Sequence, residues 1–482
     1  MAGVFTIGEK KARPGVYTRY ENAGGVAPAG AVNGIGAVVI RANWGPLNKL
    51  VDIDSPSAAA SIFGTELTVD AITEMFNGGC SKVKAVRAGS VRAGSGGTAA
   101  SITLKDGATT DDGATTDAVK ITAKYVGDRP FNVTIRDSLL NDDKRECIIY
   151  SGTTEFEKVE FTKGAAGAGE PAALVAAFAN SKNFTAEKLA DGNKVLATVA
   201  QSAMTAGTNP TVTNTEYSAA LNVLEAGKWN VLCVDTSDTA VHALVQSFIQ
   251  RIYLAGATSM ACIAETKDVE LDTRMTHAAA FNDEKMHFVL NPAYDASGNL
   301  YDGYKLAARI GGMIAAVPSN TSLTHTVVNG FVSLAEPLTN SQIEKALAKG
   351  CIVLTVNASD QIWIESAINT LVTPSGNQDE GWKKIRRTKT RFELIERIVA
   401  TTDPLIGKIN NDSDGRATFI AAAQGVVNAM IGEKKLLEGG TVYEDPLNPP
   451  AGDSAWFVIA VDDIDSIEKA YLTFKFRFSP EY

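Results

Sequence analysis

The sequence predicts an α/β core domain with a mixed sheet, into which a β-rich domain is inserted. In residues 26–94 and again in residues 213–462, short apolar runs alternate with helix-like segments, which is the rhythm of a layered α/β domain. Between them, residues 95–212 are dominated by Gly, Ala, Thr and Asp and carry repeated turn signals. A chain of 482 residues also exceeds what one hydrophobic core supports, so several domains are expected.

The first part of the core is predicted to run strand, helix, helix, strand. A buried strand is expected within residues 34–53, where an apolar run is closed by a Trp-Gly-Pro turn. Ser55 and Pro56 form a typical helix start, and a second helix pattern in "DAITEMFNGG" (70–79) ends at glycine. The last strand of this part is predicted in "KVKAVRAG" (82–89).

The insert and the second part of the core follow different patterns. In the insert, strands are predicted at residues 100–104, 117–126, 131–137 and 146–151, and one helix at 171–181. In the second part, helices are predicted at residues 217–227, 239–257 and 304–317, and strands at 229–235, 259–265 and 285–291. Short strands between turns indicate a small β-rich module, whereas regular alternation of helix and strand indicates a partly parallel sheet.

The bulk composition argues against several classes of protein. A net charge of −10 does not suit a general nucleic-acid binder, which needs a basic face. The five cysteines are odd in number and lack CxxC spacing, so buried thiols are expected rather than disulfides or a zinc site. The first fifteen residues contain no apolar run, and later apolar stretches are too short to span a bilayer, so neither a signal peptide nor a membrane segment is expected.

A search for catalytic chemistry finds no phosphate-binding loop, dinucleotide fingerprint, nucleophile elbow or HExxH motif. The histidines show no ligand spacing; they are His242, His277, His287 and His325. Asp235 follows a predicted strand, where α/β enzymes place ligand-binding groups, but the next residues are typical of a helix N-cap, and capping is the favoured interpretation. We therefore expect no cofactor and no metal.

One strongly basic run occurs at residues 382–398, where apolar side chains recur at roughly helical spacing. The cations that define its basic strip are Lys383, Lys384, Arg386 and Arg387. Two interpretations stay open, namely a solvated amphipathic surface or a strip that faces an acidic partner, either another copy or an acidic companion. Nucleic acid is a poorer partner, because no series of aromatic stacking residues accompanies the charges.

The C-terminal residues alternate strictly between apolar and polar side chains. Leu472, Phe474, Phe476 and Phe478 share one face, and Thr473, Lys475 and Arg477 share the other. This period of two predicts a β-strand with an apolar face, which needs a sheet to join. The pattern alone favours a strand that folds back onto its own sheet over one that pairs with another subunit.

Six segments form an ordered set along the chain. They are "RPGVYTRYENA" (13–23), "GIGAVVIRANWGP" (34–46), "KYVGDRPFNVTI" (124–135), "TAGTNPTVTNTEYSAALNVLEAGKWNVLCV" (205–234), "IESAINTLVT" (364–373) and "IGKINNDSDGRA" (406–417). In this order they resemble the contractile tail sheath proteins of phages and phage-tail-like bacteriocins, with the style of the Gram-positive type. Pro130 and Phe131 replace the usual Gly and Asn of the family, but they lie in the inserted domain.

The resemblance implies a structural protein and not an enzyme. Sheath subunits form stacked rings around an inner tube, exchange strands with their neighbours, and contract from a metastable state to drive the tube through a cell envelope. The partners it implies are further copies, the inner tail tube protein, and baseplate and tail terminator proteins, with no nucleic acid and no insertion into a membrane. The implied location is a virion or phage-tail-like particle, after synthesis in the cytoplasm of the bacterial host.

The same resemblance implies that residues 1–25 and 463–482 are extended terminal arms and reverses the preference for a folded-back strand. Pairing between subunits is then expected at Val16, Tyr17, Thr18, Leu472, Phe474, Phe476 and Phe478. The inserted domain, residues 95–212, is expected on the outside of the assembly, where its solvated composition fits. A helix near residues 416–438 is expected to face the tube, with contact candidates Glu433, Lys434 and Lys435 at its charged end. The alternatives are an α/β enzyme, either a hydrolase or a nucleotide binder, and another polymeric shell protein.

Overall fold

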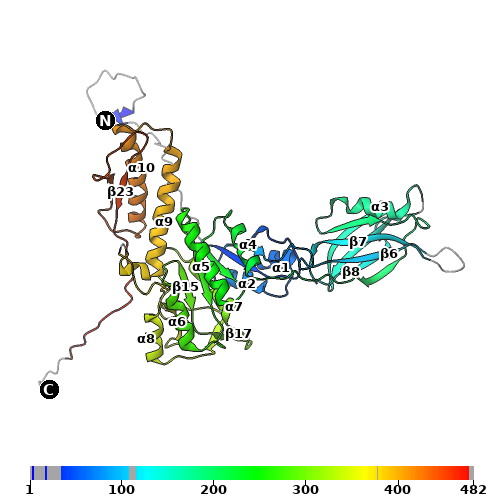
Figure 1. The fold of residues 1–482 in the computed structure, drawn as a ribbon, viewed down its shortest axis with the longest axis horizontal. Coiled ribbons are helices and arrows are strands. Elements are labelled where there is room, and N and C mark those ends of the chain that lie inside the picture. The colour runs from blue at the N-terminus through cyan, green and yellow to red at the C-terminus, as the bar shows by residue number, and fades with distance from the viewer. Residues whose placement is uncertain are drawn as a thin grey trace. The chain divides into compact units, whose positions relative to one another are not determined.

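The computed structural model describes residues 34–107, 115–164, 166–376 and 378–476, together with two short strands, β1 (Gly3–Val4) and β2 (Tyr17–Thr18) (Figure 1). The chain divides into two compact units, one made of residues 32–393 with 463–482, the other of residues 394–462 with 1–31. The sequence had placed residues 213–462 in one core. The division falls inside helix α9 (Ile385–Thr402), whose unbroken helical pattern gives no sign of a boundary.

A seven-stranded mixed sheet forms the centre of the larger unit, as predicted. Its order is β19-β15-β14-β13-β3-β5-β4, and every pair is parallel except β4 with β5. The strands are β3 (Ile35–Ile40), β4 (Leu50–Ile53), β5 (Lys82–Arg87), β13 (Val231–Val234), β14 (Met260–Ala264), β15 (Met286–Val289) and β19 (Cys351–Ile352). β3 pairs with β5 on one edge and with β13 on the other, so it joins the two parts of the core.

Helices cover both faces of this sheet and create two apolar cores. One face packs against α1 (Pro56–Phe63), α2 (Asp70–Asn77) and α7 (Gly303–Ala316). The other packs against α4 (Asn214–Leu224), α5 (Thr239–Leu254), α6 (Leu271–Phe281) and α8 (Asn340–Ala348). Within β3, Val38 and Ile40 enter the first core while Ala37 and Val39 enter the second, as the alternation of side chains along a strand requires.

The inserted domain forms a separate lobe beside this sheet (Figure 1). It contains a four-stranded sheet in the order β10-β9-β8-β12 and a three-stranded sheet in the order β11-β7-β6. Its elements are β6 (Ala99–Lys105), β7 (Asp117–Val126), β8 (Asn132–Asp137), β9 (Lys144–Ser151), β10 (Thr154–Thr162), α3 (Gly169–Ala177), η1 (Phe178–Asn180), β11 (Phe184–Lys188) and β12 (Val199–Ala203). The insert is therefore rich in β-strands, as predicted, and its described residues contain one α-helix, α3.

Trp44 ties the inserted domain to the core. It follows β3, yet its ring is 1% exposed and lies 4.9 Å from Phe131 and 5.2 Å from Tyr125, centroid to centroid, in edge-to-face contacts. Arg87, at the end of β5, donates to the carbonyl oxygens of Gly45 and of Val126 at 2.9 Å each. The junction is therefore packed and hydrogen-bonded rather than a loose linker.

Small sheets and a 3-10 turn complete the larger unit. They are β16 (Ala293–Asp295), β17 (Leu300–Tyr301) and β18 (Phe331–Leu334) in one sheet, β20 (Leu354–Val356) and β21 (Ile362–Ile364) in another, and η2 (Glu380–Lys383) before α9. Residues 463–476 contain no strand in the chain as described, so the strand expected from Leu472 onward is not formed here.

The smaller unit has a core of its own. It contains the end of α9, η3 (Asp403–Leu405), α10 (Ser413–Gly432) and the hairpin β22 (Thr441–Glu444) with β23 (Phe457–Ala460). Its buried side chains include Leu394, Val427, Met430, Leu436 and Val442. Among the described residues, no helix is both long enough and apolar enough to cross a membrane.

Glycines allow α2 and α7 to touch closely. A Cβ added at Gly312 would lie 2.4 Å from the carbonyl oxygen of Met75, and one at Gly78 would lie 2.3 Å from that of Arg309. Real Cβ atoms do not approach backbone this closely, so a side chain at either position forces the helices apart.

We expect Gly312→Ala to destabilise the larger unit by about 1–3 kcal/mol, because the methyl group overpacks this contact. Gly425→Ala is the matched control, since the same methyl group enters open space on exposed α10; it should stabilise by up to about 1 kcal/mol through helix propensity. Urea unfolding followed by circular dichroism measures both. Equal effects of the two changes would contradict the close contact.

Candidate assembly interface

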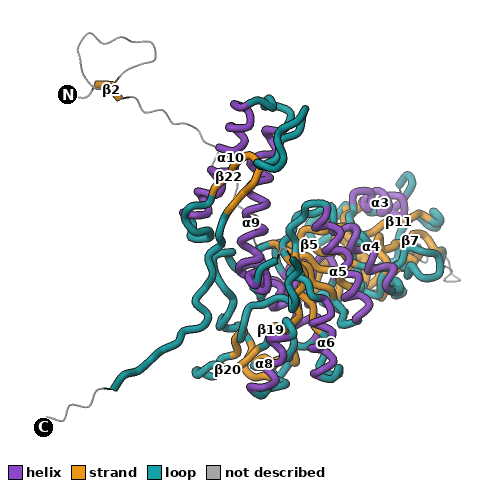
Figure 2. The backbone as a smooth tube through the Cα atoms, turned by 60° about the vertical axis from the view of Figure 1, so that its left-hand side comes forward, coloured by secondary structure: helices purple, strands orange, loops and turns teal. Residues whose placement is uncertain are grey.

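The free segment, residues 469–476, is the most exposed apolar stretch among the described residues. Leu472, Phe474 and Phe476 are 76%, 73% and 93% exposed, and Tyr471 is 89% exposed. Figure 2 shows the segment extending away from the body of its own unit. Within the described chain it forms no hydrogen bond, so the folded-back alternative is not what these residues adopt. An apolar strand pattern left unpaired is a template for another strand.

The anchor segment, residues 463–468, precedes it and lies against the basic strip. Arg387 holds Asp463 through two parallel hydrogen bonds of 2.7 Å, and Arg391 adds a third of 3.1 Å. Arg391 also binds Asp379 at 3.0 and 2.9 Å. Burial alone would raise the pKa of Asp463, but the two guanidinium groups hold it below its ordinary value.

Further along the anchor segment, Lys384 binds Asp465 at 2.7 Å and Glu468 at 3.1 Å. Arg386 donates to the hydroxyl of Ser466 at 2.6 Å. Lys383, by contrast, turns to Glu380 at 2.8 Å. The acidic partner of the basic strip in this structure is thus a segment of the same chain, which neither earlier interpretation of the strip included. The sequence hint was the acidic run in "VDDIDSIE" (461–468).

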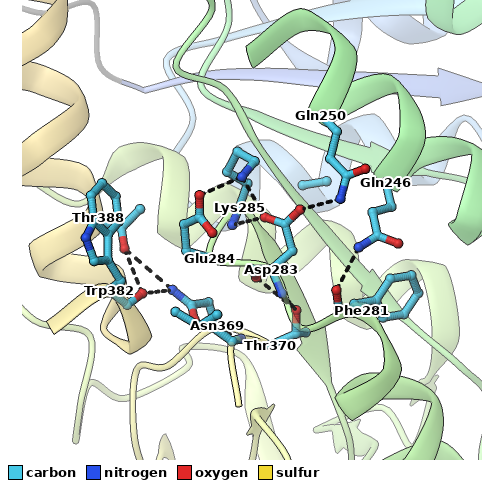
Figure 3. A network of polar contacts seen from close by, with 12 residues as sticks. Gln246, Gln250, Phe281, Asp283, Glu284, Lys285, Asn369, Thr370, Trp382 and Thr388 are labelled. Carbon is cyan, nitrogen blue, oxygen red and sulfur yellow. Dashed lines mark hydrogen bonds and ion pairs between the residues drawn. The ribbon is translucent and has the colours of Figure 1, made fainter. Parts of the chain in front are cut away.

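The segment around "INTL" (368–371) fixes the basic strip to the sheet (Figure 3). The side chain of Asn369 donates to the carbonyl of Trp382 at 2.6 Å, and its backbone N–H donates to that of Lys383 at 3.0 Å. The next residue, Thr370, donates through its N–H to Met286 of β15 and through its hydroxyl to the carbonyl of Asp283, both at 2.9 Å. Two adjacent polar residues therefore bridge the sheet and the start of α9.

In the smaller unit, α10 blocks one edge of the hairpin, and the other edge pairs with no strand among the described residues. Gln424 of α10 accepts from the N–H of Val442 in β22 and donates to the carbonyl of Gly440, which directly precedes β22, both at 2.9 Å, so these two groups point away from β23. Val442 is opposite Ile459. In an antiparallel pair, two opposite residues either both point their backbone N–H and C=O toward each other or both point them away, and here both point away. The N–H and C=O of Ile459, and of Phe457 two residues earlier, therefore face outward from β23.

The candidate tube-contact residues separate into one exposed and two paired side chains. α10 ends at Gly432, so all three lie beyond the helix that the sequence extended to residue 438. Glu433 binds Arg397 at 2.6 and 2.9 Å and Lys435 at 2.6 Å. Because Lys435 is 7% exposed, it is not a surface contact, which corrects its expected role. Lys434 is exposed.

At the N-terminus, Tyr17 and Thr18 pair in parallel with Gly3 and Val4. Val16 and Phe478, also expected to pair between subunits, lie outside the described residues. The expected pairing of this arm with another subunit therefore stays a prediction.

The carboxyl edge of the sheet contains the strongest candidate for an enzyme site, and its carboxylate accepts hydrogen bonds from four donors. Asp235, buried between β3 and β13, accepts from the N–H of Arg41 at 2.7 Å, from its Nε at 3.0 Å, from the hydroxyl of Tyr217 at 2.5 Å, and from that of Thr68. Three of these donors bind Oδ2, and the hydroxyl of Tyr217 binds Oδ1. Burial, and then the nearby carboxylate, raises the pKa of Tyr217.

The expected capping role of Asp235 is therefore wrong. The N-cap of α5 is Asp238, whose side chain accepts from the N–H of Ala240 at 2.8 Å. Sequence reasoning missed this network because its donors, Arg41 and Thr68, lie far away along the chain. The arrangement stabilises the junction of the two parts of the core.

Two buried histidines and two buried cysteines elsewhere in the core favour their neutral forms. Burial lowers the pKa of His242 and His287 to about 4, and each ring makes one bond to a carbonyl oxygen, of Thr236 and Ala261 respectively. All five cysteines are buried, and burial raises the pKa of Cys80 and of Cys351 to about 12. Within the described ranges, no group of three or more His, Cys, Asp or Glu side chains is placed to hold a metal ion.

Stability should fall on acidification from pH 7 to pH 5. Unfolded histidine binds protons below about pH 6.5, whereas His242 and His287 stay neutral in the fold down to about pH 4. Each is expected to cost ~2 kcal/mol at pH 5. In urea titrations at both pH values, His287→Asn should reduce the difference in unfolding free energy between pH 7 and pH 5 by that amount. An unchanged difference in His287→Asn would refute the assignment.

A family model and a protein of Bacillus subtilis match this chain in sequence. Residues 211–370 match the family model described as the phage tail sheath protein central domain. The phage-like element PBSX protein XkdK of Bacillus subtilis is 21% identical over 398 residues, which cover 79% of this chain and 78% of that protein.

Two solved structures share the fold. A sheath tail protein from Desulfitobacterium hafniense has a TM-score of 0.70 at 18% identity, covering 93% of this chain and 100% of that one. A sheath tail protein from Listeria innocua has a TM-score of 0.68 at 17% identity, covering 91% and 96%. Residues 211–370 therefore match the central domain of the phage tail sheath family, and the chain shares the α/β fold of these two sheath tail proteins, which is the fold class that the sequence predicted.

Proposed function

We propose that this chain polymerises into a contractile sheath around an inner tube by donating its C-terminal strand to a neighbouring copy. The observation that carries the proposal is the free segment, whose apolar face is exposed and whose backbone is unpaired. A strand given to the next copy is a heterologous contact, and such contacts propagate into rings and helices.

The energetics favour donation over exposure. Burying a large apolar side chain such as Leu472, Phe474 or Phe476 contributes about 1.5–3 kcal/mol each. The ladder adds hydrogen bonds for backbone groups that water now satisfies. Because the outer edge of β23 presents the outward groups of Phe457 and Ile459, it is the acceptor we assign in the receiving copy.

The other components of the assembly are inferred from the similarity of this chain to tail sheath proteins. We infer that the sheath encloses an inner tail tube protein, ends at baseplate and terminator proteins, and drives the tube through an envelope on contraction. The subunit would be made in the bacterial cytoplasm and act without catalysis, in a phage or a phage-tail-like particle. Asp235 supports a structural role, since a buried carboxylate that accepts from four donors of its own chain is not poised as a base.

Replacement of Phe474 and Phe476 by Asp should abolish polymerisation and leave the fold intact. The substituted carboxylates would be buried without partners in the neighbour's sheet, which costs several kcal/mol. Electron microscopy should show tubes for the parent chain and none for the variant, and circular dichroism should give equal spectra. The exposed Leu139, in the inserted domain, provides the control Leu139→Asp, which should still form tubes. Normal tubes from the Phe variant would refute strand donation.

The exposed residue beyond α10 provides a test of tube contact. Lys434→Glu should reduce the yield of tube-filled sheaths severalfold when tube protein is co-expressed, because reversal of an exposed charge weakens a contact without disturbing the core. Empty sheaths should form as before. The comparison Lys49→Glu, at another exposed lysine, should change neither yield. If both variants fill equally, Lys434 is not at the tube.

A further inference from the structure

The free segment begins abruptly, because Glu468 is the last described residue of the chain that makes a hydrogen bond or an ion pair. Both oxygens of this carboxylate are used: one accepts from the hydroxyls of Ser322 at 3.0 Å and Thr324 at 3.1 Å, the other pairs with Lys384 at 3.1 Å. From Lys469 onward, the described residues make neither a hydrogen bond nor an ion pair. Glu468, which is bound to the subunit body, is therefore followed directly by Lys469, which is not.

Side chains make most of the contacts that hold the anchor segment. Apart from an isolated β-bridge at Asp463, the segment lies in no helix or strand, and no backbone–backbone hydrogen bond is found for residues 464–468 among the described residues. Asp463, Asp465 with Ser466, and Glu468 bind instead at three successive points along the basic strip. Contacts at three points fix both the position and the direction of an otherwise extended chain.

The contacts are of a strong type. Asp463 is 8% exposed and its pairing with Arg387 is bidentate, which makes the bond charge-assisted and poorly screened by salt. Arg391 is itself held, because its guanidinium lies 4.5 Å from the centre of the Trp382 ring and binds Asp379. Removing one partner of such a cluster leaves a partly buried charge unpaired.

Force on the end of the chain therefore has a continuous route into the sheet. It passes from the anchor segment to the basic strip, then through Asn369 and Thr370 to β15. We propose that this ion-pair cluster is a mechanical anchor, which fixes the length of chain available for donation and transfers tension on the donated strand to the subunit body. This inference rests on the proposed strand donation. Release of residues 463–468 would lengthen the arm by roughly 20 Å at about 3.3 Å per residue.

The test is an anchor variant in the full chain, Asp463→Asn with Glu468→Gln, which preserves shape and removes both charges. Its matched control is Asp268→Asn with Glu66→Gln, two exposed carboxylates given the same charge change. Each is combined with Ile467→Cys, which carries a nitroxide label; Ile467 is 92% exposed, and the native cysteines are buried.

We expect the label at residue 467 to give a slow component in the parent and the control and to lose it in the anchor variant, with no change in the thermal midpoint of the body. Tubes of the anchor variant should fall apart at a lower urea concentration than control tubes. An equally immobile label in all three proteins would overturn the anchor, and so would equal urea resistance. Absence of tubes from every protein would instead refute strand donation, and the label would still report on the anchor in the unassembled chain.

Discussion

The pairing of β3 on both edges is the constraint on which the fold depends. Its partners come from opposite sides of the inserted domain: Gly36 lies beside Val83 of β5 and also beside Val231 of β13. The sheet can therefore form only if the chain leaves the core after β5 and returns to it before β13 at the same place. It does so through a short stem, where Ser90 donates to the carbonyl of Thr211 at 2.9 Å. An insert held on such a stem can change its sequence without disturbing the sheet, except at residues that contact the core, such as those that meet Trp44 and Arg87.

Much of the fold could be predicted because local patterns and tertiary structure agree. The buried run of β3, the Ser-Pro start of α1 and the alternation of the insert each give the element found. Two features escaped prediction for a physical reason. The division inside α9 leaves helical periodicity unbroken, and the network around Asp235 joins residues that only the folded sheet brings together.

The interface was predicted unevenly for the same reason. Alternation identified the apolar face of the C-terminal residues, since a period of two is visible in the sequence alone. Alternation could not show that Lys435 is buried. That burial depends on the fold, which brings Arg397 of α9 to Glu433, the ion-pair partner of Lys435. Nor could alternation show which edge of the hairpin is open, because that depends on Gln424 reaching β22 from α10. Charge and periodicity in the sequence indicate which side chains need a partner. Only the fold shows whether that partner lies within the same chain.

The burial of every cysteine has a consequence for a particle made of many copies. A thiol at the surface of each subunit would be repeated along the whole polymer, and oxidation outside the reducing cytoplasm would cross-link neighbours that must move past one another. Here all five thiols are buried, and burial raises the pKa of Cys80 and of Cys351 to about 12, so almost none of either is present as reactive thiolate. A polymer of this chain, of the kind proposed above, would therefore not be locked by disulfide bonds between neighbours in an oxidising medium.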